Sequence, residues 1–255
     1  MKTKIEKLLS DARTFREQGR FAESLANLHQ VVNAVPTDLR YKYLLASTYF
    51  EAENIEAAKK YAKEVIDEDK KSKEALELSG LICVKEGKYK EAEDYYKQAL
   101  RIDPDFHNAR MKLILLDYEF LKSYEEMEKH CKYMLDHRDI DRETLPPKSK
   151  YKILINWYNT VITGLIHALA NQAKYEEAIH FTNEYIQFLN SSLKRPRKTQ
   201  FLNQYANIYK FIYLMNDKER LKAYKKELTD FFSDVEDFGE NDFKFWEDLA
   251  KQNSF

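Results

Sequence analysis

Residues 73–105 read KEALELSGLICVKEGKYKEAEDYYKQALRIDPD, and this stretch decides the fold. Its apolar residues recur with the spacing of two amphipathic helices, and Gly87 stands between them where the chain must turn back. Gly80 and Ala92 are small, so the two predicted helices can cross closely. Pro104 ends the second helix, because proline cannot continue it. The stretch therefore predicts a helical hairpin that leads into a further unit.

The same pattern recurs with a fixed period. Gly19 and Gly87 are 68 residues apart, which is twice 34, and Ala58 precedes Ala92 by 34 residues. One shift of 34 residues towards the N-terminus places Ala46, Tyr49, Ile55, Ala58, Ala62 and Val65 in the pattern. A second shift places Ala12, Phe15, Gly19, Phe21, Ser24, Leu28, Val31 and Pro36. A period of this length is typical of stacked helical hairpins.

The unit resembles the tetratricopeptide repeat (TPR) at Leu76, Gly80, Gly87, Tyr89, Ala92, Tyr96, Ala99, Leu100 and Pro104. The resemblance is close over residues 5–105 and looser beyond them. It implies an all-α fold, a right-handed superhelical solenoid of about five to six helix-turn-helix units with a C-terminal capping helix.

Beyond residue 105 the pattern slips and then breaks. One extra residue places Leu115, Tyr118, Tyr124, Met127, Cys131 and Met134 in a fourth, degenerate unit. Residues 136–150 are polar and contain two prolines, which predicts a loop between repeats, and the motif returns as YEEA at residues 175–178. We therefore expect units 1–4 in residues 1–135, the polar loop in 136–150, TPR-like units 5 and 6 in 151–233, and an acidic and aromatic cap or tail in 234–255.

The composition argues against several classes of protein. The 42 basic residues nearly balance the 43 acidic ones, so no global field draws the chain to nucleic acid. The first 15 residues do not resemble a signal peptide, and no apolar run reaches the roughly 20 residues of an integral membrane segment. Cys83 and Cys131 fall on apolar helix faces, so we expect free thiols in a reducing compartment. The sequence predicts a cytoplasmic protein.

No residue pattern indicates catalysis. His130, Cys131 and His137 are close in the sequence, but they lack the converging spacing of zinc ligands. Glycine-rich phosphate loops and the common catalytic motifs are absent from the sequence. We therefore predict a protein that is not an enzyme and has no catalytic residues, no metal and no cofactor.

The resemblance implies that the first helix of each unit lines a concave groove. The exposed positions chosen as the partner-binding groove are Leu9, Arg13, Tyr43, Phe50, Leu81, Val84, Leu116 and Phe120. A contiguous apolar floor with charged edges is typical of a protein-binding surface, and aromatic residues are favoured anchors. Alternatively, the next repeat or the C-terminal segment covers these side chains.

The best understood TPR groove binds a C-terminal carboxylate through lysine, arginine and asparagine side chains. The corresponding positions here are Leu9, Arg13, Leu44, Glu74 and Leu78. Only Arg13 among them could contact an anionic group. The sequence therefore favours an apolar or amphipathic segment of a partner as the ligand.

The predicted function is a non-catalytic scaffold or adaptor that binds another protein or peptide. The alternatives are a self-assembling subunit, for example a homodimer, and an export or assembly chaperone, with a small-molecule-sensing regulator or an enzyme least favoured. The C-terminal residues 231–255 alternate aromatic and acidic side chains. We expect them to cap the last hairpin, since a repeat array needs a covered end, and the alternative is docking in a groove of this chain or of a neighbour.

Overall fold

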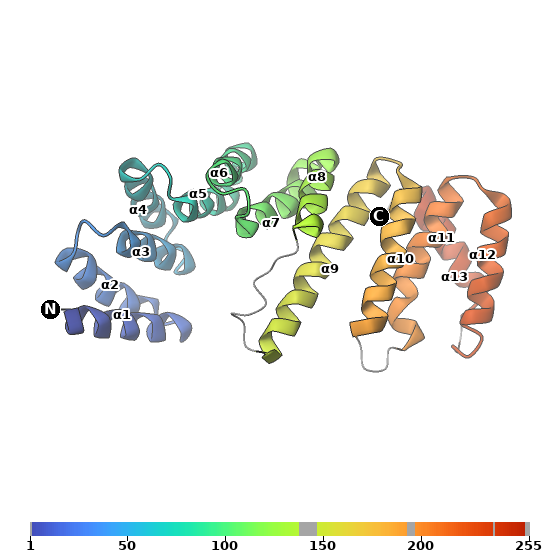
Figure 1. Ribbon diagram of the computed structural model, residues 1–255, viewed down its shortest axis with the longest axis horizontal. Helices are drawn as coiled ribbons and strands as arrows, with labels where there is room; N and C mark the ends of the chain where they lie inside the picture. The colour runs from blue at the N-terminus through green and yellow to red at the C-terminus, as the bar shows by residue number, and fades with distance from the viewer. Residues whose placement is uncertain (1, 138–146, 193–196, 237, 253–255) are drawn as a thin grey trace. The chain divides into compact units, whose positions relative to one another are not determined.

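The computed structural model describes residues 2–137, 147–192, 197–236 and 238–252 (Figure 1). These residues form thirteen α-helices, one π-helical turn and one 3-10 turn, and they contain no strand. The chain divides into two compact units, Met1–Leu116 and Asp117–Phe255. The all-α prediction is therefore confirmed.

The N-terminal unit is a series of helical hairpins. Its helices are α1 Lys2–Glu17, α2 Phe21–Ala34, α3 Leu39–Glu51, α4 Ile55–Glu68, α5 Lys73–Lys85, α6 Tyr89–Ile102 and α7 His107–Leu116. Each helix packs against the next one along the chain, and α3 also contacts α5. The first helices of the second and third hairpins therefore lie beside each other.

Each of these hairpins turns through one residue with left-handed backbone. That residue is Gly19, Glu53 or Gly87, with φ of 72°, 59° and 74°. The next N–H bonds back to the end of the first helix, for example from Lys88 to the carbonyl of Cys83 at 2.8 Å. Glycine adopts this conformation freely, whereas glutamate does so at a cost. The repeats therefore share the turn geometry rather than the glycine.

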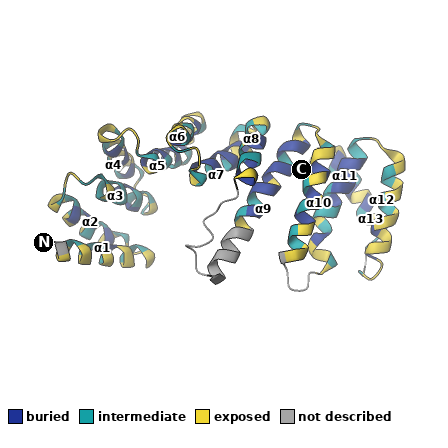
Figure 2. Cartoon of the chain, viewed as in Figure 1, coloured by how far each residue is buried: buried dark blue, intermediate teal, exposed yellow. Residues whose placement is uncertain are grey.

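Small residues let the helices of each hairpin cross closely. Ala58 and Ala92 are fully buried, and Ser24 donates a 2.8 Å hydrogen bond to the carbonyl of Ala12 on the opposing helix. Figure 2 shows that each of these helices has a buried side and an exposed side. A Cβ atom at Gly80 would overlap the ring of Tyr96, which is itself fully buried. The predicted role of small side chains at the crossing is confirmed for this unit.

The C-terminal unit continues with less regular elements. They are the π-helical turn η1 Asp117–Leu121, α8 Tyr124–Asp136, α9 Pro147–Asn171, α10 Tyr175–Ser192, the 3-10 turn η2 Lys198–Phe201, α11 Leu202–Leu214, α12 Lys218–Phe231 and α13 Glu240–Lys251. Left-handed residues mark its turns at Lys122, Ala173 and Asn216. The hairpins predicted for units 5 and 6 are α9 with α10 and α11 with α12.

The π-helical turn accounts for the slipped register. Buried residues of α7 follow those of α5 at an offset of 34, so that Ala109 repeats Ala75 and Leu116 repeats Ile82. The left-handed Lys122, however, lies 35 residues after Gly87. A π turn inserts one residue into a helix. The extra residue is therefore inside η1, after Leu116, and not before Leu115 as predicted.

The last helix covers the final hairpin, as predicted for a cap. Phe243 and Trp246 of α13 are buried in one cluster with Tyr209 of α11 and Phe232 of α12. The Tyr209 ring lies 5.1 Å from Phe243 and 5.7 Å from Trp246, and its hydroxyl donates a 2.8 Å hydrogen bond to Glu247. The aromatic residues of this segment thus pack on their own unit.

The structure also bears on the predicted polar loop and on the two cysteines. Most of the predicted polar loop, residues 138–146, lies outside the described residues, and α9 begins at Pro147, within the range predicted as loop. Cys83 and Cys131 are both buried and unpaired with each other. None of the described helices is long and apolar enough to cross a lipid bilayer.

Candidate functional site

Five of the predicted groove residues are half-buried on the first helices of the N-terminal unit: Leu9, Tyr43, Phe50, Leu81 and Val84. One side of Leu9 packs on the cluster of Ala12, Leu28 and Leu45. Tyr43 and Phe50 pack in the same way on the cluster that contains Ala46 and Leu78. Their remaining surface faces solvent, so each could also contact a ligand.

A pocket of about 430 Å³ lies between α1, α2 and α3. Its walls are Leu9, Ala12, Arg13, Arg16, Ser24, Leu28, Arg40, Tyr41, Tyr43, Leu44 and Thr48. The structure therefore brings the predicted residues Leu9, Arg13 and Tyr43 into one hollow. Its floor is apolar, and its polar lining is dominated by guanidinium groups.

The pocket is more basic than the sequence suggested. Arg40 bonds to Asp38 through Nε and Nη2, at 2.9 and 2.6 Å, and Arg16 lies 3.4 Å from Glu51. Neither carboxylate belongs to the pocket wall. Sequence comparison with the known TPR groove selected only Arg13, because Arg16 and Arg40 fall outside the positions used there.

Acidic residues also act on Tyr43. Burial raises the pKa of the Tyr43 hydroxyl, Glu77 and Glu74 of α5 and Glu51 of α3 raise it further, and Arg16 opposes them. Burial also raises the pKa of Glu77, against the attraction of Lys112 and with the repulsion of Glu74. Tyr43 therefore experiences positive charge from α1 and negative charge from α5.

The structure corrects the prediction for Leu116. Its side chain is 2% exposed, so it belongs to the core and not to the groove. The physical reason is the position of the extra residue, because α7 keeps the 34-residue offset as far as Leu116. At that offset the position that repeats Leu81 is Leu115, which is half-buried.

Phe120 belongs to the C-terminal unit. It is 41% exposed, as is its neighbour Tyr118, whose ring lies 4.7 Å from that of His167 on α9. Phe120 is thus at the surface, as predicted. Its participation in a groove with Tyr43 and Phe50 stays a prediction.

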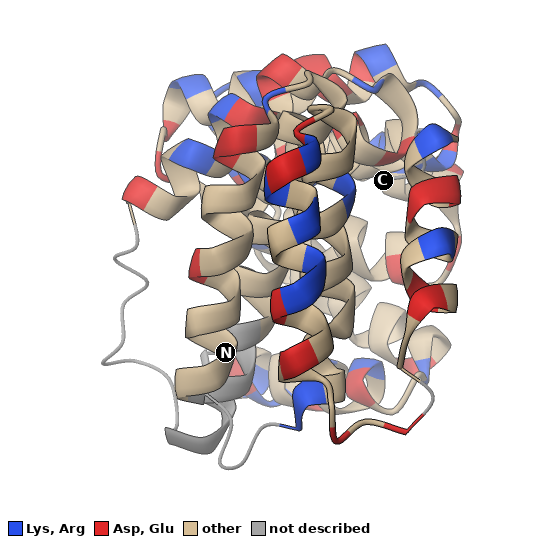
Figure 3. Ribbon diagram, turned by 90° about the vertical axis from the view of Figure 1, so that its right-hand side faces the viewer, with Lys and Arg blue, Asp and Glu red and all other residues tan. Residues whose placement is uncertain are grey.

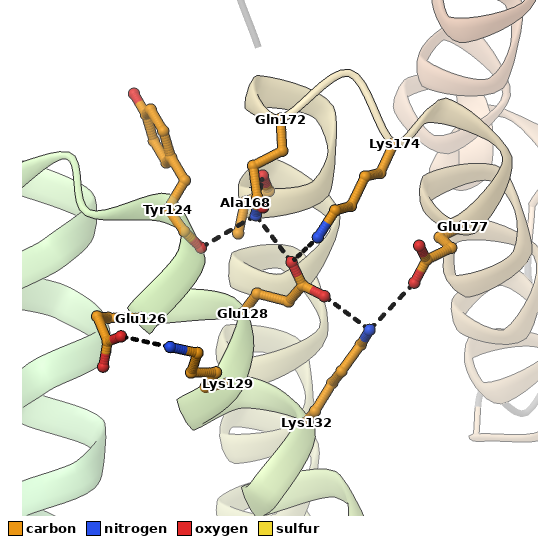
Figure 4. Close-up of polar contacts among 9 residues, drawn as sticks. All are labelled: Tyr124, Glu126, Glu128, Lys129, Lys132, Ala168, Gln172, Lys174 and Glu177. Carbon is orange, nitrogen blue, oxygen red and sulfur yellow. Dashed lines mark hydrogen bonds and ion pairs between the residues drawn. The ribbon is translucent and has the colours of Figure 1, made fainter.

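A polar cluster in the C-terminal unit joins α8 to the α9–α10 hairpin (Figure 4). Glu128 accepts hydrogen bonds from Lys132 at 2.7 Å, from Gln172 at 2.8 Å and from Lys174 at 2.8 Å. Burial raises the pKa of Glu128, but these three donors outweigh burial and lower it to about 2. Because the carboxylate is already matched by its donors, we assign this cluster to stability rather than to ligand binding.

The charges of the C-terminal unit are mixed elsewhere too. In Figure 3 the helices nearest the viewer carry both Lys or Arg and Asp or Glu, among long uncharged stretches. Burial raises the pKa of both cysteine thiols, so neither is an activated nucleophile. Among the described residues no group of three histidine, cysteine or acidic side chains could hold a metal ion.

The sequence was compared with known families and proteins. A family model described as tetratricopeptide repeat matches residues 9–58 and again residues 43–105. No curated protein matches the chain. The family match thus covers the first three hairpins, including the pocket.

Solved structures are similar over most of the chain. A tetratricopeptide repeat protein from Parabacteroides merdae aligns with 97% of this chain and 84% of its own, at 17% identity and a TM-score of 0.51. PilF of Pseudomonas aeruginosa aligns over 97% and 98%, at 11% identity and a TM-score of 0.59. YrrB, described as a TPR protein with an unusual peptide-binding site, aligns over 82% and 93%, at 14% identity and a TM-score of 0.58. At these identities the likeness shows a shared fold.

Proposed function

We infer the function from the premise that residues 9–105 of this chain are tetratricopeptide repeats and that the rest of the described chain has the same kind of fold. We propose that the chain is a non-catalytic scaffold whose N-terminal unit binds an apolar or amphipathic segment of another protein. Among proteins with this fold, YrrB is described as having a peptide-binding site.

One observation carries the proposal. Leu9, Tyr43 and Phe50 each pack against the core and remain partly exposed, and two of them, Leu9 and Tyr43, line a pocket of about 430 Å³. Partly exposed aromatic and aliphatic side chains beside a hollow are favourable anchors for an extended or helical segment. The chemistry of the pocket, apolar with arginine at its edge, fits an amphipathic ligand better than a purely apolar one.

Peptide selection tests the proposal directly. Random peptides displayed on phage would be selected on the wild-type protein, and the affinity of the selected peptides measured by fluorescence anisotropy. We expect the double variant Tyr43→Ala, Phe50→Glu to weaken binding by roughly tenfold or more, as loss of aromatic anchors usually does.

Tyr95→Glu is the matched control, because Tyr95 is a half-buried aromatic residue on the second helix α6. It should leave the affinity unchanged. Thermal melts would show that each variant is folded. Peptides that bind the double variant as tightly as the wild type would place the binding site outside this face.

A further inference from the structure

The pocket end of the groove carries one more positive charge than its ion pairs neutralise. Three arginines, Arg13, Arg16 and Arg40, line the pocket, and within the described residues Arg16 pairs with Glu51 and Arg40 with Asp38. Arg13 is exposed and makes no ion pair with any residue in the described part of the chain. A carboxylate that entered the pocket would find this guanidinium available.

The α5 end of the same face carries uncompensated negative charge. Glu77 is half-buried and has no ion-pair partner within 4.0 Å among the described residues, and Lys112 acts on it only from a longer distance. Glu74, one helical turn earlier, is exposed and adds charge of the same sign. A cation placed here would relieve the repulsion between the two carboxylates.

The two ends are joined by α3. Tyr43 lines the arginine pocket and also feels the charges of Glu77 and Glu74, and α3 packs directly against α5. Packed helices are 8–10 Å apart, and α1 and α3 line the same pocket, so the span from α1 to α5 is of the order of two such steps, roughly 16–20 Å. An extended chain covers that distance with about five or six residues.

We propose that the segment bound by this groove is bipolar: an acidic side chain enters the pocket of Arg13, Arg16 and Arg40, an apolar residue lies on Tyr43, and a basic side chain about five or six residues from the acidic one reaches Glu77. The inference rests on the proposed function, because it specifies the ligand of the same face. The face thereby selects its partner by the order of charges and also fixes the direction in which the segment binds.

Four synthetic peptides with one shared apolar centre test this. Both ends of each peptide are blocked by acetylation and amidation, so that only side chains carry charge. Two peptides are bipolar, with acidic residues at the N-terminal or at the C-terminal side, one is acidic at both sides and one is basic at both sides. We expect one of the bipolar peptides to bind roughly tenfold more tightly than either single-sign peptide, with the difference shrinking as salt is added.

Two charge-reversal variants should change which of the four peptides binds most tightly, and the two changes should be in opposite directions. Arg13→Glu makes the pocket end less basic and leaves the α5 end acidic, so the all-basic peptide should gain affinity relative to the bipolar one. Glu77→Lys makes the α5 end less acidic and leaves the pocket end basic, so the all-acidic peptide should gain. Lys60→Glu and Glu91→Lys, at exposed positions of the second helices α4 and α6, are the matched controls and should leave the ranking unchanged.

The outcomes separate the two proposals. If none of the four peptides binds, the groove is not a site for segments of this kind, and the proposed function is overturned together with the inference. If all four bind equally and Phe50→Glu still abolishes binding, the proposed function stands and the charge selectivity is overturned. A ranking that does not respond to Arg13→Glu and Glu77→Lys also overturns the inference.

Discussion

The two units keep the same hairpin plan but hold it together differently. In the N-terminal unit small residues, Ser24, Ala58 and Ala92, let the helices cross closely. In the C-terminal unit Met127 of α8 occupies the position that repeats Ala92, whereas Ala178 of α10 keeps a small, fully buried residue there, and specific side-chain clusters join the elements of this unit. One cluster is polar around Glu128 and the other is aromatic around Trp246.

Glu93 and Glu128 show the difference at a single repeat position. They are 35 residues apart and both are buried. Glu93 pairs with Lys90 and Lys97 of its own helix, whereas Glu128 reaches Lys174 in the next hairpin. The comparison teaches that a repeat pattern can fix the helices while the contacts between hairpins are replaced. The following substitutions test whether the two units are stabilised independently of each other.

The largest loss of stability is expected for Trp246→Ala. The indole packs against Tyr209, Phe238 and Phe243, and loss of a buried tryptophan costs about 3–5 kcal/mol. Hydrogen exchange should show reduced protection in α11–α13 and unchanged protection in α1–α6. Phe245→Ala is the control, because that ring is 60% exposed. Equal loss of protection in α1–α6 would show that the two units unfold as one.

A smaller loss of stability is expected when Glu128 is protonated at low pH. Its pKa is lowered to about 2 in the folded chain from an ordinary 4.5, so its contribution is fully present above pH 4.5 and is lost as the pH falls towards 2. One pKa unit corresponds to about 1.4 kcal/mol, and partial solvent screening reduces the total to the order of 2 kcal/mol. Urea unfolding of the C-terminal unit across this pH range measures the loss.

Glu128→Gln should remove most of that acid dependence and lower stability at neutral pH. Glu93→Gln is the matched substitution in the N-terminal unit, and it should cost less because the partners of Glu93 lie on its own helix. Equal losses for the two variants would contradict the view that Glu128 fastens one hairpin to the next.

Gly80→Ala tests the close crossing in the N-terminal unit. The new methyl group would overlap the buried Tyr96 ring, and after the gain in helix propensity we expect a net loss of about 1–2 kcal/mol. In a Tyr96→Ala background the same substitution should become neutral or stabilising. Denaturant titrations of the four proteins in this cycle measure the coupling, and additive losses would mean that the two residues do not meet.

The smallest effects are expected at the turns. Gly87→Ala places a methyl group on backbone with φ of 74° and should cost about 1 kcal/mol. Ala173→Gly, at φ of 56° in the other unit, should have the opposite sign and a size of about 0.5 kcal/mol. Shifts of the same sign at both sites would contradict a shared turn.

The hairpins were predictable because their signals are local. Gly19 and Gly87 marked two turns, and the 34-residue period placed Ala58 at the same hairpin position as Ala92. The position of the extra residue was not predictable in this way. Residues 113–116 read LILL, so within this run a shift of one residue exchanges one apolar side chain for another.

The candidate site was predicted only in part for a related reason. Periodicity identified the face that carries Leu9, Tyr43 and Phe50, because one helical stripe defines it. It could not show that Arg40 turns towards Asp38 and that Arg16 approaches Glu51 from another helix. It equally could not show that Glu128 meets Lys174, which is 46 residues away in the sequence. Such contacts depend on side-chain conformation and on packing between helices.

The π-helical turn Asp117–Leu121 has a practical consequence for recombining this chain with other repeat arrays. Up to Leu116 a foreign module with a spacing of 34 can be spliced in frame, since buried positions coincide on both sides of the junction. From Lys122 to the end of α8 the equivalent positions are displaced by one. A chimera joined beyond this point must therefore keep the five residues of the turn as an adaptor, or it will rotate the foreign helix by about 100° and present its polar side to the core.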